Sequence, residues 1–261
     1  MLNLQNLNLV DSHCHLNMID LAPFDNDRAK VIAAAHELGV KNMVCVNVEC
    51  EKFDEVYSWA EEFDCVTASV GKHPADKDGI EATYEWLKEK AALPKVVAIG
   101  ETGLDYHWCK GDLTWQQDRF RAHIQVGKET GLPLIIHTRN AKEDTIKILK
   151  EENTGPGVFH CFTEDYEMAK QGLDLGFYIS FSGILTFKNA KDLQEVAKKV
   201  PLDRILVETD APYLTPMPYR GKPNQPGYTR YVAEFLAQLR GIGVAEVAEA
   251  TTANFQKLFG V

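Results

Sequence analysis

Short apolar runs alternate along this chain with longer stretches in which apolar residues recur every three or four positions. The short runs are rich in Val and Ile and are mostly apolar at successive positions, which is typical of strands buried on both faces of a parallel sheet. We therefore predict eight parallel strands, at residues 8–10, 42–48, 66–70, 96–100, 133–137, 157–161, 177–181 and 205–208.

The longer stretches have the period of helices with one apolar face. In residues 28–38, for example, Val31, Ala35 and Leu38 share one face, and Gly39 is the kind of residue on which helices commonly end. We predict a helix after each strand and one more to close the chain, at residues 28–38, 53–63, 81–92, 114–130, 142–151, 166–175, 190–199, 229–239 and 244–259.

This alternation of strand and helix predicts one α/β domain over residues 1–261, because no linker or low-complexity segment divides the chain. Eight strand–helix units favour a (β/α)8 TIM barrel, and the length of 261 residues is ordinary for that fold. An open sheet with an added strand is the alternative. Residues 210–228 are rich in proline and glycine, and we expect them to form a long ordered loop that carries function.

The formal net charge of −10 changes the expected range of partners. Proteins that coat duplex DNA by neutralising its phosphates are usually basic, so this mode of binding is disfavoured. A local basic rim around a site stays compatible with this charge, because steering depends on the local field.

Cysteine usage and hydropathy indicate a cytoplasmic protein. The six cysteines form no C-x-x-C pair, and we expect a reducing environment. Residues 1–10 lack the basic start and long apolar stretch of a signal peptide, and no run approaches the length of a membrane span. We therefore expect no membrane association, and no obligate protein partner is evident.

Imidazole and charged residues directly follow most of the predicted strands, where a barrel keeps its catalytic groups. His13 and His15 are two positions apart on one strand, so they point to the same side and can bind one metal ion. His137 and His160 each end a Val/Ile-rich run, where an unpaired ring would be costly to bury. Taken singly, each histidine also has an ordinary explanation as a loop or core residue.

Glu101 and Asp210 end two further strands and supply negative charge. Each alone could be a cap or turn residue, but all six residues on one face indicate a centre for two divalent ions, Mg, Mn or Zn. We predict Glu101 as the bridging carboxylate and Asp210 as the general base that activates water. The predicted metal ligands are His13, His15, Glu101, His137, His160 and Asp210.

Four further residues are predicted to contact substrate: His73, Arg139, Arg220 and Lys222. The three cations could form the local basic rim, and His73 could bind a phosphate or orient a ligand. The alternatives are a structural turn for His73 and solvated surface charges for the others. Residues 106–108, Tyr-His-Trp, could stack bases or pack the loop in which they lie.

Several motifs, in order along nearly the whole chain, resemble those of the TatD family of metal-dependent deoxyribonucleases, and in particular its YcfH-like branch. The motifs are DSHCH (11–15), GKHP (71–74), GETGLDY (100–106), HTR (137–139), HCF (160–162), GFYISFSG (176–183), ETDAPYLTP (208–216) and RGKPNQP (220–226). One departure is Gln225, which stands where many members have Glu.

The resemblance implies a TIM barrel of the amidohydrolase superfamily with a two-metal centre. One ion would take His13, His15, Glu101 and Asp210, and the other would share Glu101 and add His137 and His160. It also implies 3′–5′ exonuclease-like cleavage of single-stranded DNA or RNA, often with Mg²⁺.

Three functions are compatible with these residues. The leading one is a metal-dependent deoxyribonuclease acting on single-stranded nucleic acid. The second keeps the site and changes the substrate to another ester or amide, such as a lactone, a phosphotriester or an aminoacyl-tRNA, because one barrel hosts many chemistries. The third is a metal-binding scaffold without turnover, which would have no use for a positioned base.

Overall fold

Eight parallel strands form one sheet in the computed structural model, which describes residues 7–261. Each strand pairs with the next strand along the chain. The backbone N–H of Asp210 donates to the carbonyl of His13 over 2.9 Å, which joins the segment after the last strand to the first. The TIM-barrel prediction is therefore confirmed. The strands are β1 (Leu9–Cys14), β2 (Val40–Cys45), β3 (Val66–Val70), β4 (Val96–Asp105), β5 (Leu134–Arg139), β6 (Gly157–Phe159), β7 (Tyr178–Phe181) and β8 (Ile205–Val207).

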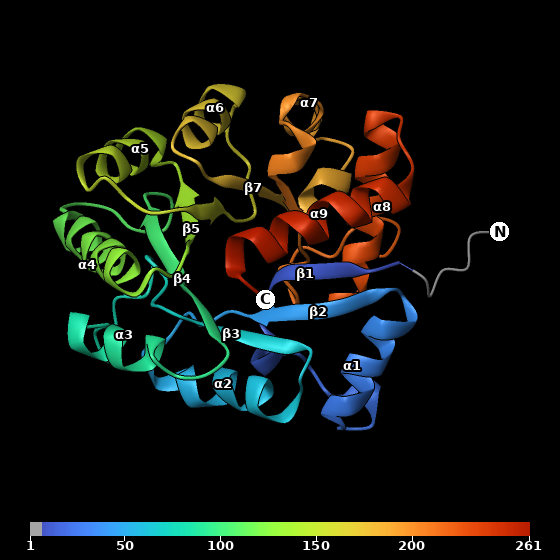
Figure 1. Cartoon of the computed structure of the whole chain (residues 1–261), viewed down its shortest axis with the longest axis horizontal. Helices are drawn as coiled ribbons and strands as arrows, with labels where there is room; N and C mark the ends of the chain where they lie inside the picture. Colours follow the sequence, from blue (N-terminus) through green and yellow to red (C-terminus); the bar gives the residue numbers. More distant parts are fainter. Residues whose placement is uncertain (1–6) are drawn as a thin grey trace.

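A helix follows every strand, and the helices surround the sheet (Figure 1). The predicted helices are all present, with boundaries shifted by at most a few residues. They are α1 (Arg28–Glu37), α2 (Phe53–Glu62), α3 (Tyr84–Ala91), α4 (Thr114–Thr130), α5 (Lys142–Glu151), α6 (Tyr166–Asp174), α7 (Lys191–Lys199), α8 (Thr229–Arg240) and α9 (Val244–Phe259).

Side chains alternate between two apolar layers, as the pleat of a strand requires. In β2, Met43 packs in the layer between strands and helices, whereas Val44 packs in the barrel interior with Val10 of β1. The interior layer also includes Phe255 and Phe259 of α9.

Helix α9 closes the end of the barrel at which the strands begin. The side-chain amide of Asn254 donates to the carbonyls of Leu202 and Ile205, over 2.9 and 2.8 Å, just where β8 starts. The opposite end, where the strands finish, is left to the loops that carry the polar motifs.

The segment 210–228 is a long loop, as predicted, and its helical part is the 3-10 helix Pro226–Tyr228. The prediction about a leader in residues 1–10 falls partly on residues 1–6, which lie outside the described part of the chain. Within residues 7–261, none of the helices combines the length and apolar character needed to cross a bilayer.

Buried His123 of α4 connects this helix to the loop after β3. Its Nδ1–H donates to the carbonyl of Arg119 over 2.8 Å, and its Nε2 accepts the backbone N–H of Lys72 over 3.2 Å. These two bonds require a neutral ring. Burial lowers the pKa of His123 from about 6.5 to about 4, so the ring stays neutral well below neutral pH.

We expect this histidine to make the protein less stable in acid. Between about pH 6.5 and pH 4 the unfolded chain binds a proton at His123 that the folded protein excludes. The contribution of neutral His123 to the free energy of unfolding is therefore complete above about pH 6.5 and is lost as the pH falls towards about 4. The stability difference between wild type and His123→Gln, measured by urea unfolding, should shrink by roughly 2–3 kcal/mol across this window. A constant difference would contradict the assignment.

Candidate metal centre

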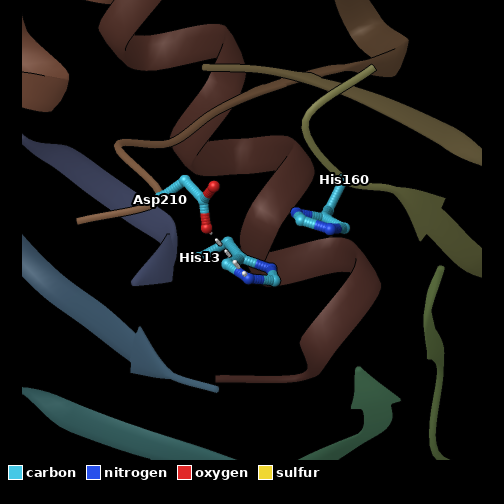
Figure 2. Close-up of side chains that lie close together, drawn as sticks. All are labelled: His13, His160 and Asp210. Atoms are coloured by element: carbon cyan, nitrogen blue, oxygen red, sulfur yellow. Dashed lines mark ion pairs between the residues drawn. The ribbon is translucent and has the colours of Figure 1, made fainter. Parts of the chain in front are cut away.

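Six ionisable side chains from separate parts of the chain meet at the end of the barrel where the strands finish. Glu101 and His137 lie within β4 and β5, and His13 lies within β1. His15 and His160 directly follow β1 and β6, and Asp210 lies three residues after the end of β8. Figure 2 shows His13, His160 and Asp210 pointing towards one another, with His13 and Asp210 joined by a dashed line.

Glu101 is in the middle of this cluster and is almost completely buried, with its side chain 3% exposed. Its Oε1 lies 3.0 Å from His160 Nε2, 3.2 Å from His137 Nδ1 and 3.4 Å from His73 Nε2. Its Oε2 lies 3.3 Å from His13 Nε2. A carboxylate that reaches four histidines from its two oxygens has the geometry expected of a bridging ligand.

Asp210 is the second carboxylate and stands nearer the solvent, with its side chain 14% exposed. Its Oδ1 lies 3.2 Å from His15 Nε2 and 3.6 Å from His13 Nε2. The backbone of Asp210 has a φ of 58°, in the left-handed region that few residues other than Gly, Asn and Asp adopt readily. This conformation turns the chain at the end of β8 while the side chain contacts the histidines.

The cluster is electrostatically arranged to hold positive charge. Burial opposes ionisation of Glu101, yet the histidines around it hold its pKa well below the usual range. Burial would likewise lower the pKa of His160, but Glu101 and Glu208 beside it raise that pKa well above its usual value. The same balance holds at Asp210: burial would raise the pKa of this carboxyl, but the contact with His15 lowers it below its usual value. The ionised carboxylates thus raise the pKa of His15, His137 and His160, whereas burial lowers the pKa of His13 and His73. A site with this excess of negative charge favours a bound cation.

The donor set fits divalent metal ions. Within residues 7–261, neither ring nitrogen of buried His13 makes a hydrogen bond of good geometry, although Nε2 lies 3.3 Å from Glu101 Oε2. Buried polar atoms nearly always have a hydrogen-bond partner. Imidazole and carboxylate donors without a thiolate suit Zn, Mn or Mg. Three sets of donor atoms lie within 4.8 Å of one another: His13, His160 and Asp210; His13, His15 and Glu101; and His73, Glu101 and His137.

A family model described as TatD related DNase matches residues 10–260, which is nearly the whole chain. The chain belongs to this family. The resemblance drawn from the sequence motifs is therefore confirmed.

Relatives of this TatD-family chain match it over almost their full length. An uncharacterized metal-dependent hydrolase of Escherichia coli, YcfH, is 48% identical over 97% of this chain and 96% of its own. A Bacillus subtilis protein of the same description, YabD, is 44% identical over 97% of this chain and 99% of its own. The crystal structure of YjjV, a TatD homologue from Escherichia coli, superposes with a TM-score of 0.88 at 30% identity, over 97% of this chain and 98% of that one.

Two carboxylates of the TatD-family centre had no role in the sequence-based prediction, although both lie in its motifs. Asp105 Oδ2 lies 3.0 Å from His137 Nε2, and Glu208 Oε1 lies 3.3 Å from His160 Nδ1. Such partners orient a ligating ring and fix its tautomer. The sequence could have indicated Asp105, because this residue is four positions after Glu101 on the same strand and so points to the same side.

The predicted substrate residues of this TatD-family chain occupy different settings. His73 contacts Glu101 directly, and burial lowers its pKa to about 4, so its neutral ring can also act as a metal donor. Arg139 is exposed at the end of β5, beside the cluster. In the loop after β8, the Arg220 guanidinium lies over the ring of Phe187, and Lys222 Nζ lies 5.8 Å from the centre of the Tyr219 ring. Substrate contact by these residues stays a prediction.

Gly103 lets the backbone of β4 lie close to the backbone of His137 in β5, within the TatD-family centre. Its φ is 131°, and an added Cβ would lie 2.0 Å from the carbonyl oxygen of His137. We expect Gly103→Ala to displace His137, to cost at least about 2 kcal/mol of stability and to weaken metal binding. Thermal unfolding and metal titration would measure both effects. Gly155→Ala is the matched control, because no atom lies within 4 Å of its added Cβ, and equal effects of the two variants would contradict the explanation.

Proposed function

We propose that this protein is a metal-dependent hydrolase that cleaves phosphodiester bonds in single-stranded nucleic acid, in a 3′–5′ exonuclease-like manner. The observation that carries the proposal is the contact of Glu101 with four histidines, next to a second, partly exposed carboxylate, Asp210. This arrangement provides donors for two divalent ions and leaves one carboxylate facing the side from which water and substrate arrive.

The residues that would hold two divalent ions fall into two sets, with Glu101 common to both. One set is His13, His15 and Asp210, and the other is His137 and His160. Divalent ions bound there supply Lewis-acid stabilisation of the developing negative charge and lower the pKa of a bound water.

In this proposal Asp210 is the general base. Its carboxylate is held ionised by His15, whose Nε2 lies 3.2 Å from Oδ1. This partly exposed carboxylate can therefore accept the proton of the attacking water. Asp105 and Glu208 keep His137 and His160 oriented while this proton moves.

The choice of a phosphodiester substrate rests on the family. The matching family model is described as a DNase, and the relatives YcfH and YabD are described as metal-dependent hydrolases. The exposed guanidinium of Arg139, two residues after His137, offers positive charge for a phosphate.

A second candidate substrate is a small uncharged ester, such as a lactone or a phosphotriester. The observation that favours it is the net charge of −10, which opposes accumulation of a polyanion around the protein. The same ions and the same base would serve this hydrolysis, so the substrate alone separates the two candidates.

The deciding experiment is hydrolysis of an end-labelled single-stranded oligonucleotide with Mg²⁺, Mn²⁺ or Zn²⁺, with and without chelator. The Asp210→Asn protein, prepared in parallel, controls for contaminating nucleases. A metal-dependent ladder that only the wild type produces would support the proposal and give the polarity. No cleavage by protein with metal bound would overturn it, and lactone, phosphotriester and aminoacyl-ester substrates would then be assayed.

A further inference from the structure

We propose that Trp108 and Tyr213 are two base-stacking subsites that flank the metal centre, so that the nucleosides on either side of the scissile phosphate each lie against an aromatic ring. This inference rests on the proposed function and adds to it the residues that bind the bases. It also explains how an acidic protein could hold a polyanion, because stacking does not depend on net charge.

The first observation is the exposure of these two rings. Trp108 is 67% exposed and Tyr213 is 54% exposed, and within residues 7–261 all other Trp, Tyr and Phe side chains are buried or half-buried. A large exposed ring leaves apolar surface in water without contributing to the core. That both such rings lie beside the candidate metal centre indicates a shared role there.

Tyr213 is held on one side of the centre. Its backbone N–H donates to the carbonyl of Asp210 over 2.8 Å. Its ring stands edge-on to the ring of His15, with 6.2 Å between the ring centres. A base resting on Tyr213 would therefore lie next to the residues proposed to hold the first ion.

Trp108 is held on the other side by the carboxylate that orients His137. Asp105 Oδ1 accepts the backbone N–H groups of His107 and Trp108 over 2.8 Å each, while Oδ2 contacts His137 Nε2. The guanidinium of Arg139 lies 5.5 Å from the centre of the Trp108 ring. One carboxylate thus positions both a proposed ligand and an exposed ring, and an adjacent cation is available for a phosphate.

The topology places the two rings across the centre from each other. Trp108 follows β4 and Tyr213 follows β8, and these strands are four positions apart in an eight-stranded barrel. A single-stranded nucleic acid that crosses the metal centre would meet one ring before the scissile phosphate and the other ring after it. Stacking accepts any base but requires bases that are not already paired and stacked. We therefore expect preference for single strands with little dependence on sequence.

The test compares an oligothymidylate with a strand of 5,6-dihydrothymidine, which keeps the hydrogen-bonding groups but loses the planar aromatic ring. We expect wild type to bind oligothymidylate more tightly. Trp108→Ala and Tyr213→Ala should each weaken oligothymidylate binding about tenfold and reduce the difference between the two strands, with unchanged metal content. Trp108→Phe and Tyr213→Phe should retain most of the binding. Ile80→Ala, which removes an exposed side chain that is not aromatic (57% exposed), should have no effect.

Binding is measured by fluorescence anisotropy in the Asp210→Asn background, so that it does not depend on cleavage. Equal affinity of both alanine variants and the parent protein for oligothymidylate would overturn the subsites, even if wild type cleaves the strand. Loss of binding in the alanine variants, together with no cleavage by wild type, would support the subsites and overturn the nuclease chemistry instead.

Discussion

Asp210→Asn is expected to lower kcat about a thousandfold while leaving substrate affinity nearly unchanged. The amide cannot accept a proton from the attacking water, whereas it retains the size of the carboxylate. Asn also tolerates the left-handed backbone conformation with φ of 58° at this position, so the fold is expected to persist. Steady-state kinetics on the substrate identified by the oligonucleotide assay would measure the split between kcat and KM.

Asp112→Asn is the matched control for this substitution, because it removes the same charge from an exposed carboxylate that caps the turn before Thr114. It should leave kcat unchanged. If Asp210→Asn instead lost metal and substrate binding in parallel with activity, Asp210 would be a ligand without a separate role as base.

Glu101→Gln is expected to reduce the bound metal to one ion or none, with loss of nearly all activity. Glu101 contacts His13, His73, His137 and His160, so an amide there would remove the negative charge that both proposed ions share and would direct N–H groups at them. Elemental analysis of the protein after desalting would give the metal content. Two retained ions would exclude the bridging role.

Glu208→Gln provides the comparison for Glu101→Gln. It removes the same charge from a buried carboxylate whose side-chain contacts, among residues 7–261, are with His160 Nδ1 and the backbone N–H of Cys161. Loss of such an orienting partner typically weakens metal affinity by about 10–100-fold. We therefore expect Glu208→Gln to bind both ions when metal is supplied in excess.

The fold could be predicted from the sequence because buried parallel strands and one-sided helices have distinct apolar periods. The strand ends were predicted less well where polar residues begin. β1 continues to Cys14 and β4 to Asp105, whereas the apolar runs stop at Val10 and Gly100. The barrel continues these strands into the metal centre, where side chains face ionisable neighbours, so hydrophobicity no longer marks the strand.

The six proposed ligands could be found from the sequence because each stands at the end of an apolar run. Pairings between residues distant in the sequence could not be found in this way. That His73 contacts Glu101, and that Glu208 contacts His160, depends on strand tilt and on loop conformation after each strand. The same holds for the placement of Trp108 by Asp105, since the loop sequence alone does not show which backbone groups the carboxylate accepts.

The seam where the segment after β8 meets β1 has a consequence for synthesis of the protein. Asp11 accepts the backbone N–H of Thr209 over 2.9 Å, across 198 residues of chain, and the neighbouring pair of Asp210 and His13 completes the same seam. A nascent chain that has not yet reached this point has two unpaired strand edges, which are prone to wrong pairing. Its His15 also lacks the carboxylate of Asp210, whose Oδ1 lies 3.2 Å from His15 Nε2 in the folded protein. The full set of proposed ligands is therefore assembled only after the segment that follows β8 has been made, and a complete metal centre would mark a chain that extends beyond Asp210.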